Sequence, residues 1–331
     1  MAKLKDKVQL SLDEARMLVL GAQVLLGFQT RAVFEKGYEA LPVHARYLKL
    51  GGLGLMLLAI ALLMTPAAFH RIVEAGEDTH DLHRFSSRVM TYALWPFALT
   101  LGIDFFVVLE KLSGLAAGVL AGLAAATVAV FFWWGLELLR RARREPEIMK
   151  EKEMSRREDE EPQAGDEEEK IKDKIMHVLT EARTVLPGAQ ALLGFQFAAI
   201  LMEGFDKLPA SSKYVHICGL SLIALSVILL MTPAAYHRIV EQGEETKHFH
   251  RFAGRILIAA MIPLALGINC SFFVVARKAT DSVEFSLAAS ALGLLLFYGL
   301  WFGLTLYRRA QHTHADAAAA ARKSTARMKA V

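Results

Sequence analysis

Cysteine is scarce in this chain, and other marks of secreted proteins are missing as well. The 331 residues include only two cysteines, Cys218 and Cys270, both within apolar stretches. Two such cysteines provide no disulfide framework, which excludes the small disulfide-stapled folds. Residues 1–16 are polar and lead directly into an apolar stretch, so no cleavable signal peptide is expected.

Motifs of catalysis and of nucleic-acid binding are also missing. We find no nucleophile elbow, phosphate-binding loop or pair of catalytic carboxylates, so we predict no enzyme, no cofactor and no assigned metal. The net charge of +4 and the pI near 9.0 raise the question of nucleic acid. The basic residues flank apolar stretches and do not alternate with aromatic residues, which indicates membrane flanks and no nucleic-acid partner.

Hydrophobic residues are abundant and make up 54% of the chain. They gather in stretches of about 18–24 residues, the length that crosses a hydrocarbon core about 30 Å thick. Continuous apolar runs indicate helices, which satisfy their own backbone hydrogen bonds in lipid. We therefore predict an all-α integral membrane protein in the lipid bilayer, with eight transmembrane helices at residues 17–34, 51–69, 89–109, 115–136, 184–202, 217–236, 256–275 and 285–306.

Long motifs recur at a constant spacing along the chain. GAQVLLGFQ at residues 21–29 returns as GAQALLGFQ at residues 188–196, which is 167 residues later. LLMTPAAFHRIVE at residues 62–74 returns at the same spacing as LLMTPAAYHRIVE at residues 229–241. The spacing changes only after the third span, to 168 residues. Such a register over four predicted helices indicates that a whole folding unit was duplicated.

Each copy contains four spans, an even number, so both copies cross the membrane in the same direction. We predict two parallel four-helix units, at residues 4–142 and 171–309, related by a pseudo-two-fold axis along the membrane normal as an intramolecular pseudo-dimer. Residues 143–173 form a charged cytoplasmic linker and residues 310–331 a cytoplasmic tail. Further oligomerisation stays open.

Lysine and arginine lie mostly on one side of the predicted spans. Of the 38 such residues, 29 fall on the side of the N-terminus, eight on the other side and one, Arg31, within a span. Positively charged loops remain in the cytoplasm. We therefore predict a multi-pass protein of the bacterial inner (plasma) membrane with cytoplasmic N- and C-termini.

The loop between the second and third spans of each unit carries the most distinctive polar residues. His70 and Glu74 share a helix face, and His83 follows on the next helix, so a divalent metal is one interpretation. Helix capping with ion pairs is a second, and a ligand or proton-linked site is a third. The candidates are His70, Arg71, Glu74, Glu77, His83 and Arg84, with His237, Arg238, Glu241, Glu244, His250 and Arg251.

A second set of polar residues lies within the spans, where an amide is costly unless it finds a partner. Interhelical hydrogen bonds and the lining of a polar path both remain open for these glutamines. Asp104 lies well inside a span, and Ser271 replaces it in the second unit, so it is either a proton relay or a packed or snorkelling aspartate. The candidates are Gln23, Gln29, Gln190, Gln196 and Asp104.

The GAQxLLGFQ and LLMTPAA(F/Y)HR motifs resemble those of a bacterial membrane family known as domain of unknown function 6328. Members usually have one four-helix unit, so this chain resembles a fused tandem of two. Some members carry the label sodium:proton antiporter, which implies ion exchange as one activity. The resemblance covers residues 4–141 and 171–309.

Two functions follow from these patterns. We predict first a structural or regulatory membrane protein whose cytoplasmic loop in each repeat contacts a partner or ligand. The alternative is an ion or small-solute transporter, including a cation:proton antiporter, with its path between the repeats. A transporter requires the four glutamines to face a hydrated cavity at mid-depth, whereas a structural protein has them packed and dry.

Overall fold

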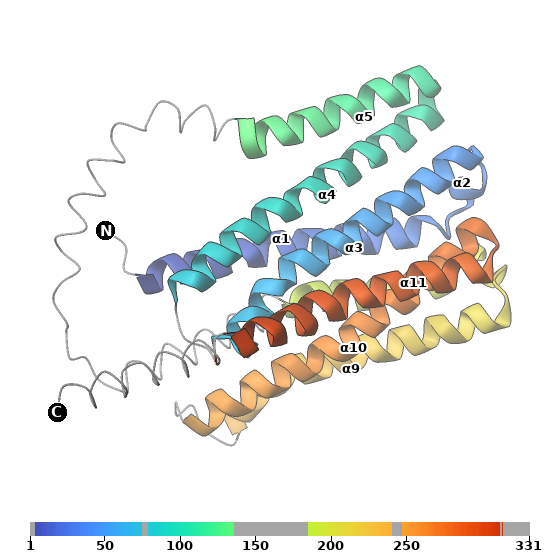
Figure 1. The fold of residues 1–331 in the computed structure, drawn as a ribbon. Helices are drawn as coiled ribbons and strands as arrows, with labels where there is room; N and C mark the ends of the chain where they lie inside the picture. Colours follow the sequence, from blue (N-terminus) through green and yellow to red (C-terminus); the bar gives the residue numbers. More distant parts are fainter. Residues whose placement is uncertain (1–3, 75–78, 136–184, 240–246, 312, 314–331) are drawn as a thin grey trace, which may run out of the picture.

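The computed structural model describes residues 4–74, 79–135, 185–239, 247–311 and 313. Within these ranges every regular element is a helix, and no strand forms. The long helices lie side by side with their axes roughly aligned (Figure 1). The predicted all-α class is therefore confirmed for the described part of the chain.

The first unit contains four long helices and one short helix at a turn. Thr79 begins the third of these long helices as its N-cap, because its Oγ1 accepts a 3.0 Å hydrogen bond from the backbone N–H of Leu82. The elements in chain order are α1 (Leu4–Ala32), α2 (Lys36–Glu39), α3 (Val43–Ile72), α4 (His80–Ser113), α5 (Leu115–Val130) and the π-helical turn η1 (Phe131–Gly135).

The second unit repeats this order. Its short helix lies beside α2, where Lys36 Nζ and Glu203 Oε1 are 2.8 Å apart. The elements in chain order are an apolar helix at Val185–Ile200, α8 (Glu203–Asp206), α9 (Ala210–Ile239), α10 (Lys247–Thr280), α11 (Val283–Tyr298) and the π-helical turn η2 (Gly299–Gly303).

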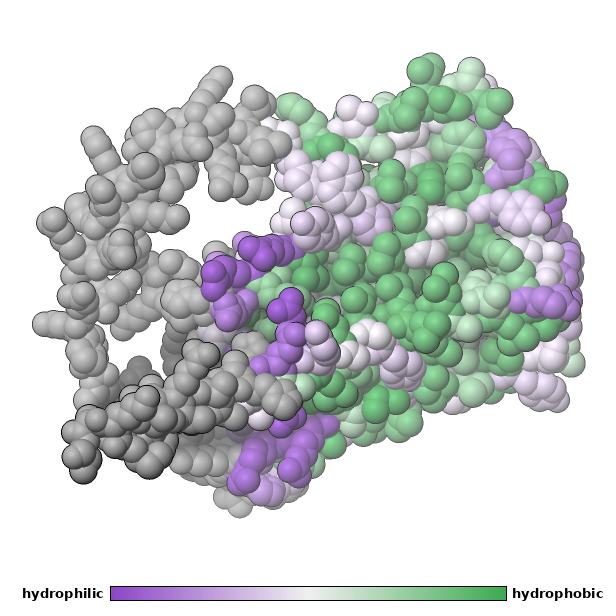
Figure 2. All heavy atoms as spheres, viewed as in Figure 1, coloured by the Kyte–Doolittle hydropathy of each residue, from purple (hydrophilic) through white to green (hydrophobic). Residues whose placement is uncertain are grey.

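Six of the described helices are long and apolar enough to cross a membrane, namely α3, α4, α5 with η1, α9, α10 and α11. Figure 2 shows their apolar side chains as a broad band with hydrophilic residues at both ends, as a bilayer requires. The predicted spans at residues 17–34 and 184–202 fall on α1 and on Val185–Ile200, which are not among the six. The first half of α1 is too polar, and the described helix at Val185–Ile200 is too short.

The helix α3 is the most enclosed of the six. It packs against α1 and α4 of its own unit and against α10, α11 and η2 of the second unit. Its counterpart α9 makes no comparable packing with α4, α5 or η1 in the described ranges. A two-fold axis requires reciprocal contacts, so the packing between the units departs from the pseudo-two-fold arrangement that the sequence predicts.

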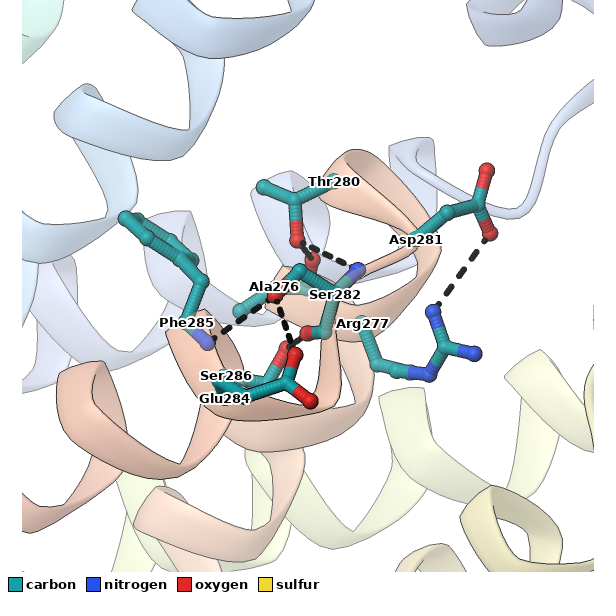
Figure 3. Close-up of polar contacts among 8 residues, drawn as sticks. All are labelled: Ala276, Arg277, Thr280, Asp281, Ser282, Glu284, Phe285 and Ser286. Carbon is teal, nitrogen blue, oxygen red and sulfur yellow. Dashed lines mark hydrogen bonds and ion pairs between the residues drawn. The ribbon is translucent and has the colours of Figure 1, made fainter.

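Tight turns join the third and fourth helices of both units, and both need a residue with positive φ. Gly114 has φ 89° between α4 and α5, and Asp281 has φ 52° at the equivalent position between α10 and α11. Figure 3 shows how hydrogen bonds hold the second turn: Ser282 Oγ caps α11 by accepting from the N–H of Phe285 at 3.1 Å, and Thr280 Oγ1 donates to the carbonyl of Ala276 at 2.8 Å. Asp tolerates the left-handed region better than most residues, which explains its presence there.

Candidate functional site

A polar cluster inside the first unit joins three helices. Asp104 of α4 accepts a 2.6 Å hydrogen bond from Gln29 Nε2 of α1, and its other carboxylate oxygen pairs with Lys49 Nζ of α3. The side chains of Lys49 and Asp104 are only 13% and 18% exposed. The cluster lies toward the end of the bundle that carries α2, since Lys49 follows the start of α3 and Asp104 precedes the end of α4.

These contacts offset the free-energy cost of placing the Asp104 carboxylate within an apolar helix bundle. A charge in the bilayer is costly unless an opposite charge or a polar group compensates it, and a buried pair is tolerated when its remaining hydrogen-bonding positions are filled. Lys49 supplies the opposite charge, and Gln29 supplies a hydrogen bond. Of the two interpretations of Asp104, the contacts favour the packed aspartate over the proton relay.

The second unit builds the same cluster from neutral side chains. Gln196 Nε2 donates to Ser271 Oγ, at the positions equivalent to Gln29 and Asp104. The position equivalent to Lys49 is His216, which is 3% exposed and whose Nε2 lies 3.1 Å from the carbonyl oxygen of Gln196. Where the carboxylate is replaced by a hydroxyl, the ammonium is therefore replaced by an imidazole. Equivalent residues thus gather in both units, but Lys49 pairs with Asp104 whereas His216 contacts the backbone of Gln196.

The two remaining glutamines behave differently from each other. Gln23 is fully buried, and its Nε2 lies 3.9 Å from the sulfur of Met64. Gln190 is exposed, and its Nε2 lies 4.0 Å from the sulfur of Met231. A thioether is a weak acceptor, so each amide is only weakly bonded there. The burial differs because Gln23 faces the second unit, whereas Gln190 faces outward.

A small cavity adjoins the second cluster at the contact between the units. Thr30 of α1 and Leu57 of α3 line one side, and Gln196 and Ser271 line the other. It has room for about one water molecule. A cavity of this size does not conduct an ion in its hydration shell.

The loop candidates of the first unit are partly buried. His70 at the end of α3 is fully buried, and Arg71 is 9% exposed and lies beside α10, where a Cβ on Gly254 would be 3.6 Å from Arg71 Cδ. Glu74 and His83 are half-buried. Arg84 is exposed and pairs with Asp81 on its own helix at 2.6 Å. His70 and Arg71 thus belong to the packing between helices.

An aromatic pair closes this end of both units. The rings of Phe69 and Phe85 stack with centroids 4.3 Å apart, and the equivalent rings of Tyr236 and Phe252 lie 4.4 Å apart. Each pair joins the end of one long helix to the start of the next. In the first unit this pair therefore ties the end of α3 to the start of α4.

Several loop candidates cannot be placed. Glu77, Glu241 and Glu244 lie outside the described residues, and His237 and Arg238 end α9 with side chains outside the described set. His250 is half-buried on α10, and Arg251 is exposed there. Among the residues that the structure describes, no group of three His, Cys, Asp or Glu side chains is arranged to hold a metal ion.

Lys49 and His216 are not evident as site residues from the sequence alone. Each precedes the apolar run of its helix, where flanking polar residues are expected. The repeat contains the signal, since the two residues are 167 positions apart, and each occupies the same place relative to its glutamine. Only the packing of α3 on α4, and of α9 on α10, shows that they reach the clusters.

A second network of charges joins the units at the end with α2 and α8. Glu39 accepts from Lys207 Nζ at 2.7 Å and from Lys278 Nζ at 2.9 Å. These two lysines lower the pKa of Glu39 to about 2. The hydrogen bond to Glu203 raises the pKa of Lys36 above its ordinary value.

Comparison with known proteins places both units in one family. The profile of a family of unknown function, DUF6328, matches residues 3–137 and residues 165–305. The chain belongs to this family. The two matched segments correspond to the two helical units, which is consistent with a tandem duplication. No curated protein and no solved structure matches this DUF6328 chain, so its function has to be argued from its own geometry.

Proposed function

We propose that this chain is a structural or regulatory membrane protein, and not an enzyme. In this proposal eight helices cross the bacterial inner membrane as two parallel units, and the ends of α3, α4, α9 and α10 that carry the histidine loops face the cytoplasm. The six apolar helices and the excess of positive charge at that end support it.

The observation that carries the proposal is the state of the intramembrane glutamines. Gln29 and Gln196 are 2% and 5% exposed, and each donates to a side chain of its own unit. Gln23 is fully buried. A solute path needs polar groups that remain available to the solute, whereas these amides hold α1 against α4 and Val185–Ile200 against α10. Three of the four glutamines therefore fit a packed interior.

The exposed arginines at the loop end support a role in contacting a partner. Arg88 of α4 is exposed, and so is its equivalent Arg255 of α10. Each unit thus presents an exposed guanidinium group on the same helix, while His70 and Arg71 are packed inside. Guanidinium groups bind carboxylates and phosphates, so the partner or ligand in this proposal is acidic.

The first experiment measures flux. Purified protein reconstituted into liposomes with an internal pH dye is challenged with sodium, potassium and proton gradients. The proposal expects the same signal as protein-free liposomes. A gradient-driven flux that depends on the protein would overturn the structural role.

A second experiment tests the contact surface in intact cells. A photo-crosslinking residue at position 88 or 255 is expected to give adducts of discrete mass. Position 214 serves as the matched control, since Tyr214 is 73% exposed near the opposite end of α9. Equal labelling at all three positions, or none at positions 88 and 255, would remove the partner contact from the proposal.

Transport remains a second candidate because of one observation, the ion pair of Lys49 and Asp104. A titratable pair within the membrane is a common feature of proton-coupled carriers. If the chain exchanges cations for protons, Asp104→Asn abolishes the flux while Ser271→Ala preserves it. The same liposome assay distinguishes this outcome from the absence of flux that the structural role predicts.

A further inference from the structure

The two units are packed in a one-directional way. Helix α3 of the first unit is covered by α10, α11 and η2 of the second. Of the 18-residue apolar segment with which α3 could cross a membrane, 78% is buried. The equivalent apolar segment of α9 is only 33% buried. A contact of this kind is heterologous, which means that it joins two different faces. We call the face that the first unit uses in this contact the outgoing face, and the face that the second unit uses the incoming face. Each unit has both. One of each remains uncovered in a single chain.

The best-defined contact between the units pairs a glutamine with a glycine. A Cβ on Gly188 would lie 1.5 Å from Gln23 Oε1, so the amide of the first unit fills the space over this glycine of the second. The equivalent residues are Gln190 and Gly21. Gln190 is exposed, and Gly21 is exposed with nothing within 4 Å of where its Cβ would be. Both halves of the same contact are therefore present on the outside of the chain.

A second contact repeats this relationship. The ring of Phe195 covers Gly27, whose Cβ would lie 2.1 Å from Phe195 Cδ2. The equivalent glycine is Gly194, which is exposed and has nothing within 4 Å, and the equivalent ring is Phe28, which is 53% exposed. The uncovered outgoing face is again that of the second unit, and the uncovered incoming face is again that of the first.

The equivalent helices α3 and α9 differ in the same way. Trp301 of η2 is fully buried and donates from Nε1 to the carbonyl of Ala61 in α3 at 2.9 Å. The residue of α9 equivalent to Ala61 is Ile228, which is 63% exposed, and Trp133 of η1, the counterpart of Trp301, is half-buried. Near α8, Phe34 is 3% exposed, whereas its equivalent Leu201 is 88% exposed.

Two further contacts locate the axis that relates the units. The rings of the equivalent residues Phe28 and Phe195 lie 4.4 Å apart, and the equivalent residues Lys36 and Glu203 form an ion pair. Two equivalent residues touch when they lie close to the rotation axis that relates their units. The axis therefore runs between α1 and Val185–Ile200. Heterologous contacts around a rotation axis produce a ring when the rotation closes.

We infer that the outgoing face of the second unit binds the incoming face of the first unit in another copy of this chain, so that several units surround one axis. The outgoing face is defined by Gln190, Gly194, Leu201 and Ile228, and the incoming face by Gly21, Phe28 and Trp133. The open space over Gly21 and Gly194 is the space that Gln23 and Phe195 fill at the equivalent glycines within the chain. A second copy supplies the surface that already fits the equivalent amide, that of Gln23.

Cysteine cross-linking in native membranes tests this inference. A chain with Gly21→Cys and a chain with Gln190→Cys are co-expressed, both with Cys218→Ala and Cys270→Ala, and are then oxidised. Since each chain carries one cysteine, any cross-link joins two chains and gives a species of twice the 36.6 kDa mass. A chain with both Gln23→Cys and Gly188→Cys is the positive control, because it forms the same contact internally.

Two comparisons decide the result. Chains with Leu120→Cys and Leu292→Cys, at positions 69% exposed on α5 and α11, measure random collision and are expected to cross-link at least tenfold less. Gly21→Leu is expected to abolish the multimer seen by native mass spectrometry in nanodiscs. Gly51→Leu, at a glycine of α3 that also has nothing within 4 Å, leaves it intact. Cross-linking no stronger than the collision pair, together with a single chain in the nanodisc, would overturn the inference.

Discussion

Gln29 donates a 2.6 Å hydrogen bond from its Nε2 to Asp104, across the contact between α1 and α4. The equivalent amide of Gln196 donates to Ser271. A lysine pairs with the carboxylate in the first unit, and a histidine lies against the glutamine in the second. The duplicated site thus has one charged and one neutral version, and each version is balanced within itself.

The first prediction concerns this charge balance. Asp104→Ser leaves the Lys49 ammonium without its counter-ion in the apolar interior, so we expect the free energy of unfolding to fall by on the order of 3 kcal/mol. The double variant Lys49→His with Asp104→Ser reproduces the second unit and should recover at least half of that loss. Denaturation in mixed detergent micelles measures both effects. Equal destabilisation of the single and double variants would contradict the prediction.

The second prediction concerns Trp301. Its indole is fully buried and its Nε1–H bonds to the carbonyl of Ala61, so Trp301→Phe removes both the hydrogen bond and part of the packing between the units. We expect a loss of about 2 kcal/mol in the free energy of unfolding. Trp133→Phe is the control in the first unit, where the ring is half-buried. Similar losses for the two variants would show that the interface is not the cause.

The third prediction concerns the two positive-φ turns. Gly114 has φ 89° and ψ 174°, a region nearly restricted to glycine, and nothing lies within 4 Å of where its Cβ would be. We expect Gly114→Ala to destabilise the protein by about 1–3 kcal/mol through the backbone alone. Asp281→Gly should change stability by less than about 1 kcal/mol, because its φ of 52° suits both residues. Thermal unfolding in detergent measures the difference, and an unaffected Gly114→Ala variant would refute it.

The fourth prediction concerns pH at the end with α2 and α8. The folded state lowers the pKa of Glu39 from 4.5 to about 2, so the stability that its ion pairs contribute is fully present above pH 4.5 and is lost as the pH falls toward 2. Hydrogen exchange of the α2 amides should therefore accelerate within this window. Glu39→Gln should exchange faster at neutral pH and lose the dependence. An unchanged pH profile in the variant would assign the effect to another group.

Much of the fold was predictable because it depends on short-range properties of the chain. Apolar runs longer than a bilayer's width identify α3, α4, α9 and α10, and the recurrence of GAQxLLGFQ indicates the duplication. The first span of each unit was harder, because α1 combines an apolar face with glutamines and a charged N-terminal half. Composition alone therefore does not qualify it as a span.

The candidate site was only partly predictable. Gln29, Gln196 and Asp104 stood out as polar residues in apolar runs, yet Lys49 and His216 did not, because each lies near the start of its helix. Whether such a side chain points into the bundle depends on how the helix is rotated, which no local pattern determines. In the histidine loop, the burial of His70 and Arg71 between helices is likewise a property of the tertiary packing.

The sequence by itself determined that this protein consists of apolar helices in two copies of one unit, because hydropathy and repeated motifs are properties of neighbouring residues. The tertiary structure alone decided how the copies meet. Gln23 and Gln190 occupy equivalent positions, yet one is fully buried and the other exposed. That difference arises because packing between the units uses one face of each, and the motifs that the two copies share cannot indicate which face is covered.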